Sequence, residues 1–208
     1  MTLVAAPKLH PTAIVEPGVT IGAGTSIWSA VHVRRGASIG DDCVIGEKTY
    51  VAYDVRIGHR CKINAMVYLC TGITLEDGVM VSAGTVFTND LYPRATTPDL
   101  QRLRSSEPDE NTLATRVRAG ATIGANATIG PGLEIGRFAM VGMGSIVTRS
   151  IPDFHLAIGT PARSVGCVCR CGRPLLWFSN DVEPCDEVAC NDCGRRYRLR
   201  GQMVDETP

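Results

Sequence analysis

Aliphatic residues or Phe recur at every sixth position over most of the chain. The series runs without a gap from Val15 to Phe87, and it resumes in the same phase from Val117 to Val147. A small or β-branched residue usually stands two positions before each of them, and Gly often follows directly after. Residues two apart in a strand point to the same side, so the large and the small residue face inward together. Six residues therefore fit one short strand plus a corner.

Three such strand-and-corner units would close a triangular coil of about 18 residues, which is the pattern of a parallel β-helix. The sequence predicts an all-β fold with about six stacked coils. Stacked aliphatic side chains would fill the interior of this rod, so any ligand must bind outside it.

The repeat is lost between residues 89 and 115, where prolines and charged residues take over. We expect this segment to leave the β-helix as a protruding loop. A loop of this length inside a compact repeat is more often functional than not, and disorder is the alternative.

Four segments resemble a known family: HPTAIVEPGVTIGAGTSIW at 10–28, VFTNDLYPR at 86–94, GATIGANATI at 120–129 and GTPARSVG at 159–166. Together with the repeat, they resemble the hexapeptide-repeat acyltransferases, and among these the N-acetyltransferases of nucleotide-linked amino sugars used for bacterial surface polysaccharides. The resemblance implies a left-handed winding and a homotrimer. It also implies that acetyl-CoA and the acceptor sugar lie in clefts between neighbouring rods.

The resemblance points to Asn89, in FTND at the start of the loop, as the catalytic residue. In that family the matching Asn lies beside the sugar amine, where an amide could hold the amine or donate a hydrogen bond to the developing oxyanion. An Asn selected for a left-handed turn is the alternative.

His32 is the second catalytic candidate, because it matches a His of the resembled family. With about 18 residues per coil, Thr71, Tyr53 and Arg35 stack in register with Asn89, whereas His32 lies about three coils, or roughly 14 Å, away. A partnership with Asn89 would therefore need a neighbouring chain. For His32, and equally for His59, a solvated or interface role is the alternative.

Three residues of the last coils and of the GTPAR turn are candidates for binding coenzyme A. Gly142 would let the pantetheine arm approach the backbone, and Arg149 and Arg163 could meet phosphate groups as charge-assisted donors. Corner geometry alone would also explain Gly142.

The tail after residue 166 lacks the apolar repeat and is rich in cysteine. Cys169 and Cys171 in CRCG and Cys190 and Cys193 in CNDCG form two pairs, each followed by Gly. Two thiolate pairs of this kind can supply the four ligands of a tetrahedral, structural Zn²⁺ site. Cys167 and Cys185 are alternative ligands, and a set of redox-active or merely buried thiols is the alternative interpretation.

The predicted organisation is a β-helix domain over residues 1–151, a connecting segment over 152–166 and a zinc ribbon over 167–208. The chain of 208 residues carries 21 basic and 21 acidic residues, so it offers no general field for nucleic acid or an anionic membrane. Its first residues show no signal-peptide pattern, and no apolar stretch has the length of a membrane span. We therefore expect a cytoplasmic protein with reduced thiols.

Two functional hypotheses follow. The first is an acetyl-CoA-dependent N-acetyltransferase that acts on a nucleotide-diphosphate-linked amino sugar, with the zinc ribbon as an accessory. The second is a non-catalytic β-helix scaffold whose zinc ribbon binds a partner. FTND, the long loop and GTPAR favour the enzyme, because a scaffold needs none of the three.

Overall fold

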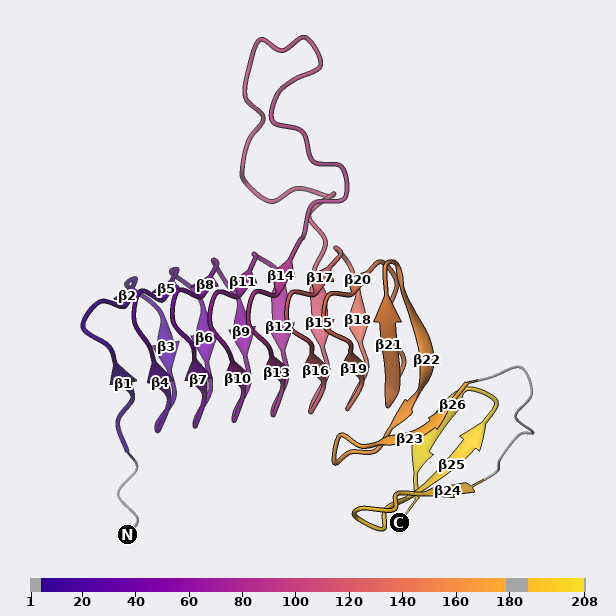
Figure 1. Cartoon of the computed structure of the whole chain (residues 1–208). Helices are drawn as coiled ribbons and strands as arrows, with labels where there is room; N and C mark the ends of the chain where they lie inside the picture. The colour runs from indigo at the N-terminus through magenta and orange to yellow at the C-terminus, as the bar shows by residue number, and fades with distance from the viewer. Residues whose placement is uncertain (1–4, 179–186, 208) are drawn as a thin grey trace.

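The structure is a computed structural model that describes residues 5–178 and 187–207. These residues form strands joined by turns and loops, without a helix. Figure 1 shows a straight rod of stacked coils, a loop that stands out from it, and a small sheet at the C-terminal end. No helix that could cross a bilayer occurs in the part of the chain that is described.

Three parallel sheets form the sides of the rod. The first side contains β1 (Lys8–Leu9), β4 (Ser26–Ile27), β7 (Val44–Ile45), β10 (Lys62–Ile63), β13 (Met80–Val81), β16 (Thr122–Ile123), β19 (Met140–Val141) and β21 (His155–Gly159). The second side contains β2 (Ile14–Val15), β5 (His32–Val33), β8 (Tyr50–Val51), β11 (Tyr68–Leu69), β14 (Val86–Phe87), β17 (Thr128–Ile129) and β20 (Ile146–Val147). The third side contains β3 (Thr20–Ile21), β6 (Ser38–Ile39), β9 (Arg56–Ile57), β12 (Ile73–Leu75), β15 (Thr115–Val117) and β18 (Glu134–Ile135).

The sixth-position residues fill the interior of the rod, as the repeat predicts. On the first side, Ile45 pairs with Ile27 and Ile63, and Val81 pairs with Ile63 and Ile123. All five are at most 2% exposed. Each coil covers the apolar residues of the next, so a single continuous core runs along the rod. The predicted parallel β-helix is confirmed.

The rod extends beyond the repeat at both ends. β1 precedes Val15 and keeps the six-residue phase at Leu9, whereas β21 follows Val147 outside that phase. After Val147 the coil continues without the six-residue repeat, since Ile151 bridges Ile135 and β21 pairs with β19. The sixth-position count of about six coils therefore describes only the regular part of the rod.

The protruding loop leaves after β14 and returns at β15 (Figure 1). Its two ends meet at the rod, where the Leu113 N–H donates to the Asn89 carbonyl at 2.8 Å and Asp90 bridges Thr112. Directly after the loop, Thr115 pairs with Ile73 of the preceding coil. The loop is thus an insertion at one corner that leaves the stacking register intact.

Beyond the rod, β21 turns back into β22 (Ala162–Val168), which pairs with β23 (Pro174–Trp177). A separate antiparallel sheet follows, with β24 (Glu187–Ala189), β25 (Arg196–Arg200) and β26 (Met203–Glu206). We call residues 167–178 and 187–207 the ribbon.

The ribbon has a small core of its own that includes a residue of the rod. Phe154 belongs to this core and makes an edge contact with the ring of Tyr197 at 5.4 Å between centroids. Phe138 stacks on the other side of Phe154 at 5.6 Å. Buried His155 adds a polar link, since its Nε2 lies 2.7 Å from the Gln202 carbonyl oxygen. Aromatic packing and this hydrogen bond hold the ribbon against the end of the rod.

Candidate functional site

A cavity of about 820 Å³ lies between the loop and the corner that joins the second and third sides of the rod. Asn89, Thr71, Tyr53 and Arg35 stand along this corner, in the stacked order that the sequence register predicts. The second side adds aromatic and thiol groups, and the loop supplies polar and charged ones. These further lining residues include Tyr50, Tyr68, Cys70, Asp54, Asp90, Tyr92, Arg94, Arg104, Glu107, Asp109 and Thr112.

Asn89 is half-buried at the upper end of the corner, where the loop begins. Its Nδ2 donates to the Thr71 carbonyl oxygen at 3.1 Å, and this bond sets which end of the amide is oxygen. The Oδ1 atom accepts no hydrogen bond from the described residues. Asn89 is absent from the residues with positive φ, so a left-handed turn does not explain it.

Asp90 follows Asn89 and lines the same cavity. Burial raises the pKa of the Cys70 thiol to about 12, with a further contribution from the Asp90 charge. Burial also raises the pKa of Tyr68. Both groups therefore stay protonated at neutral pH, and neither serves as a thiolate or phenolate nucleophile.

His32 lies on the second side, in register with Tyr50. Its Nε2 is 3.2 Å from Glu16 Oε1, and its ring makes an edge contact with Tyr50 at 5.5 Å between centroids. It does not line the cavity that contains Asn89. Within one chain the structure does not bring the two catalytic candidates together.

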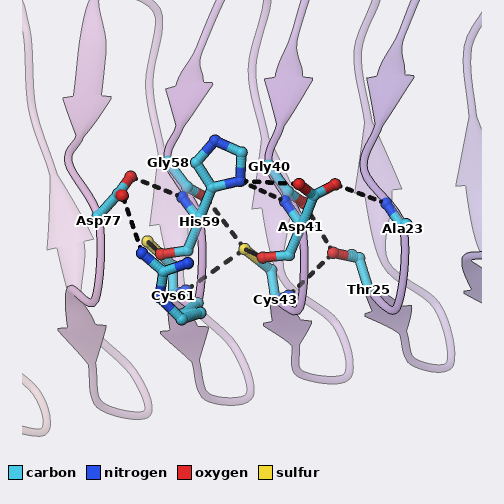
Figure 2. A network of polar contacts seen from close by, with 10 residues as sticks. Ala23, Thr25, Gly40, Asp41, Cys43, Gly58, His59, Cys61 and Asp77 are labelled. Carbon is cyan, nitrogen blue, oxygen red and sulfur yellow. Dashed lines mark hydrogen bonds and ion pairs between the residues drawn. The ribbon is translucent and has the colours of Figure 1, made fainter. Parts of the chain in front are cut away.

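His59 stands on another corner of the rod, in the polar ladder of Figure 2. Its ring Nδ1 accepts a hydrogen bond from the Asp41 backbone N–H at 3.0 Å. The backbone N–H of His59 donates to Asp77 Oδ1 at 2.9 Å. Behind this ladder, buried Cys43 and Cys61 continue a second one, since the Cys61 N–H donates to Cys43 Sγ at 3.3 Å. His59 therefore satisfies backbone groups of stacked corners and lies outside the cavity.

The coenzyme candidates lie near the last coils, away from this cavity. The Gly142 N–H donates to Ala157, and a Cβ at Gly142 would lie 3.0 Å from the Ile158 side chain. Arg163 pairs with Ile158 across the β21–β22 hairpin and is exposed. Gly142 and Arg163 thus flank the same residue. Arg149 is exposed after β20 and has no ion pair with the described residues.

The four predicted zinc ligands converge in the ribbon. The Sγ atoms of Cys169, Cys171, Cys190 and Cys193 all lie within 4.8 Å of one another. The Cys169–Cys193 and Cys171–Cys190 Sγ distances are 3.4 and 3.7 Å. A disulfide needs about 2.05 Å, whereas sulfurs bound to one tetrahedral Zn²⁺ at about 2.3 Å lie roughly 3.8 Å apart. The cluster therefore fits a zinc ion.

The surroundings of the cluster act in opposite directions on two of its thiols, since burial raises the pKa of Cys169 to about 12. The backbone N–H of Arg195 lowers the pKa of the Cys193 thiol to about 6. The Tyr197 hydroxyl lies 3.1 Å from Cys169 Sγ and accepts the Arg170 N–H at 2.9 Å. Sequence reasoning missed this Tyr, although its alternation with exposed Arg in β25 marks it as inward-facing.

Neither alternative ligand joins the cluster. Cys167 is fully buried and pairs with His155 across the hairpin, and it is not among the converging thiols. Cys185 lies outside the described residues.

A rod of hexad coils with an inserted corner loop is the architecture of a hexapeptide β-helix. Two sequence models of this class match the chain: "Bacterial transferase hexapeptide (six repeats)" at residues 18–53 and 36–69, and "Hexapeptide repeat of succinyl-transferase" at 54–89 and 117–149. Together they cover about half of the chain. The protein belongs to the hexapeptide-repeat transferase family.

Individual relatives cover parts of the chain. The chain is 46% identical over 92 residues to a dTDP-3-amino-3,6-dideoxy-α-D-galactopyranose 3-N-acetyltransferase of Aneurinibacillus thermoaerophilus. The 92 residues make up 44% of this chain and 44% of the relative. The chain thus spans less than half the length of this curated relative.

Two solved structures share the fold. A hexapeptide-repeat acetyltransferase of Vibrio cholerae, solved with acetyl coenzyme A, is 26% identical with a TM-score of 0.53, covering 64% of this chain and 70% of that one. A mutant N-acyltransferase of Bacillus cereus, solved with dTDP and coenzyme A, has a TM-score of 0.56 at 20% identity, over 80% of this chain and 86% of that one.

Proposed function

We propose that this protein is a cytoplasmic N-acetyltransferase that moves an acetyl group from acetyl-CoA to the amine of a nucleotide-diphosphate-linked amino sugar, for surface-polysaccharide synthesis. Membership of the hexapeptide-repeat transferases supports the reaction class. The acetyl coenzyme A bound to the Vibrio cholerae relative supports the donor, and the name of the Aneurinibacillus relative supports the acceptor.

The observation that carries the proposal is the free Oδ1 of Asn89 in the cavity under the loop. One N–H of Nδ2 is bound to the Thr71 carbonyl, and Oδ1 accepts from none of the described residues, so the amide offers a free acceptor. An acceptor there would hold an N–H of the sugar amine and so direct the nitrogen lone pair outward. Asn89 would thus orient the amine through Oδ1, and the second N–H of Nδ2 would still be able to donate to the developing oxyanion.

The reaction balances without a protein nucleophile. The neutral amine nitrogen attacks the thioester carbonyl carbon, the C–N bond forms, and the C–S bond of the tetrahedral intermediate breaks. The departing coenzyme A sulfur collects the proton that the nitrogen loses. This agrees with the cavity, where burial keeps the Cys70 thiol and the Tyr68 phenol protonated.

The outward face of the second side supports a homotrimer. Ile14, Tyr68, Val86 and Ile146 point outward there and are 38 to 57% exposed. Outward positions of the third side are polar or charged instead: Thr20, Ser38, Arg56, Thr74, Arg116 and Glu134. Apolar rows of this kind are usually covered by a partner. His32 stands in the same row and would then face the neighbouring subunit.

We further propose that the ribbon binds one structural Zn²⁺ through Cys169, Cys171, Cys190 and Cys193. Four thiolates leave no open coordination position, so the ion would stabilise the ribbon and take no part in acyl transfer. Gly142, Arg149 and Arg163 stay candidates for the coenzyme site at the last coils.

The test is a thiol-release assay with acetyl-CoA and a panel of UDP- and dTDP-linked amino sugars. We expect turnover with one acceptor and a loss of at least tenfold in Asn89→Ala. Asn64→Ala, which changes a half-buried corner Asn outside the cavity, is the matched control and should keep its activity. Absence of turnover across the panel, from folded protein, would favour the non-catalytic scaffold.

A further inference from the structure

The cavity under the loop is lined by three arginines with different partners. Arg104 lies 3.6 Å from Asp109 and also donates to the Tyr92 carbonyl at 3.4 Å, so its charge is balanced within the loop. Arg35 on the rod and Arg94 on the loop make no ion pair with the described residues. Arg94 donates only to the carbonyl of its neighbour Pro93, at 3.1 Å. One uncompensated guanidinium therefore comes from each wall.

The charge of Arg34, the residue before Arg35, is balanced by a carboxylate. Its Nε lies 2.7 Å from Glu16, and it donates to the Tyr50 hydroxyl at 3.0 Å. Glu16 stays ionised, because its hydrogen bond from the Arg35 backbone N–H lowers its pKa. One carboxylate thus neutralises Arg34, and it takes only a backbone N–H from Arg35.

Arg35 is held in place by an uncharged group instead. Its guanidinium carbon lies 4.8 Å from the centre of the Tyr53 ring, and the guanidinium carbon of Arg34 lies 4.3 Å from the same ring. A ring face attracts and orients a guanidinium but does not cancel its charge. Asp54, the acid next to Tyr53, places its Oδ1 over Gly36 and makes no ion pair with Arg35. The Arg35 side chain is therefore positioned and still available to an anion.

The opposite end of the same corner is acidic. Asn89 and Asp90 lie three coil spacings from Arg35, roughly 14 Å at about 4.8 Å per coil. Charge is thus separated along this corner, with a carboxylate beside the free amide oxygen at one end and the Arg35 guanidinium at the other. A ligand with an N–H donor at one end and an anionic group at the other would be oriented by this arrangement.

We propose that Arg35 and Arg94 form the diphosphate subsite of this cavity, so that the acceptor binds with its diphosphate at Arg35 and its amine at Asn89 and Asp90. The inference rests on the proposed function, whose acceptor carries a diphosphate and an amine. Guanidinium groups bind phosphate oxygens in a bidentate way, which suits this role better than a point charge would.

Calorimetric titration with dTDP and with UDP tests the subsite without any acyl transfer. We expect Arg35→Ala and Arg94→Ala to raise the Kd for the preferred nucleotide at least tenfold. Arg56→Ala is the matched control, because Arg56 is exposed on the third side and does not line the cavity. Its Kd should stay within about twofold of wild type. Arg35→Lys, which keeps the charge but loses the fork, should give an intermediate Kd.

The proposal is overturned if both alanine variants bind as tightly as Arg56→Ala, or if the wild type binds neither nucleotide. Thermal unfolding curves that coincide for all variants would show that folding is not the cause of any loss. Asp90→Asn supplies the complementary result: nucleotide affinity should be unchanged while KM for the amino sugar rises, and equal effects on both would contradict the separation of the two ends.

The two proposals fail separately. Arginine-dependent nucleotide binding without turnover on any amino sugar would keep the subsite and reject the acyltransferase. Turnover with an unchanged KM in Arg35→Ala would keep the acyltransferase and reject the subsite.

Discussion

The rod and the ribbon are both all-β, yet they are stabilised in different ways. The rod has a continuous core in which every coil contributes similar aliphatic residues. The ribbon has a core of seven buried residues, and two of these, Cys169 and Cys190, belong to the thiol cluster. Stability is therefore spread along the rod and concentrated at one point in the ribbon. A single substitution in the rod should therefore lower stability moderately and near its own site, whereas a single substitution in the thiol cluster should destabilise the whole ribbon.

Loss of one thiolate from the cluster should have the largest effect. We expect Cys193→Ser to lose bound zinc and to unfold the ribbon, because apparent zinc-binding free energies of such sites reach about 10–16 kcal/mol and supply the folding free energy. Cys193 is exposed, so the substitution leaves no cavity. Metal content by mass spectrometry and limited proteolysis of the ribbon would show it.

Cys167→Ala is the control for this experiment, since Cys167 is buried in the same core outside the cluster. It should keep one zinc per chain although it loses packing. Zinc loss in Cys167→Ala but not in Cys193→Ser would contradict the assigned ligand set.

A large-to-small change inside the rod should have an intermediate effect. Ile63 is fully buried and stacked between Ile45 and Val81, so Ile63→Ala should lower the free energy of unfolding by about 2–5 kcal/mol. Lys62→Ala, one position earlier and outward, should change it by at most about 0.5 kcal/mol. Urea unfolding of both variants measures the difference, and equal effects would contradict the assignment of inward and outward positions.

The link between the two regions should have the smallest effect, and it should depend on pH. Burial lowers the pKa of His155 below its ordinary value of 6.5. The unfolded chain then binds the proton more readily, so stability is present above about pH 6.5 and declines as pH falls below it. One group contributes at most about 1.4 kcal/mol per pH unit.

Urea unfolding of wild type and of His155→Gln at pH 7.5 and 5.5 tests this. Protonation of the four cluster thiolates, the proposed zinc ligands, affects both proteins and cancels in the comparison. Wild type should lose more stability on acidification than the variant. An identical loss of stability in wild type and variant would show that the lowered pKa of buried His155 does not contribute to the pH dependence of unfolding.

Much of the fold could be predicted from the sequence because each coil repeats one local rule. An inward residue every sixth position fixes strand, corner and stacking register together, so the neighbours of Asn89 along the corner follow from arithmetic alone. The irregular end of the rod could not be predicted in this way. Ile151 bridges Ile135 outside the six-residue phase, and no pattern in the residues around Ile151 predicts this bridge.

The candidate site was predictable only in part. Four cysteines in two spaced pairs carry their own geometric signal, and the choice of Cys169 over Cys167 agrees with the cluster. The pairing of Arg34 with Glu16 and the freedom of Arg35 depend on side-chain directions across coils. Arg34 and Arg35 differ in role because their side chains face different surroundings, and the six-residue repeat does not predict those surroundings.

The loop insertion has a consequence for how such proteins can diversify. Its two ends are joined by a hydrogen bond at the rod, and the coil resumes in register directly after it. The segment can therefore be exchanged as a cassette, much as antigen-binding loops are exchanged on an immunoglobulin framework. Recombination at this one corner would alter what the cavity recognises while the folding information of the rod stays untouched.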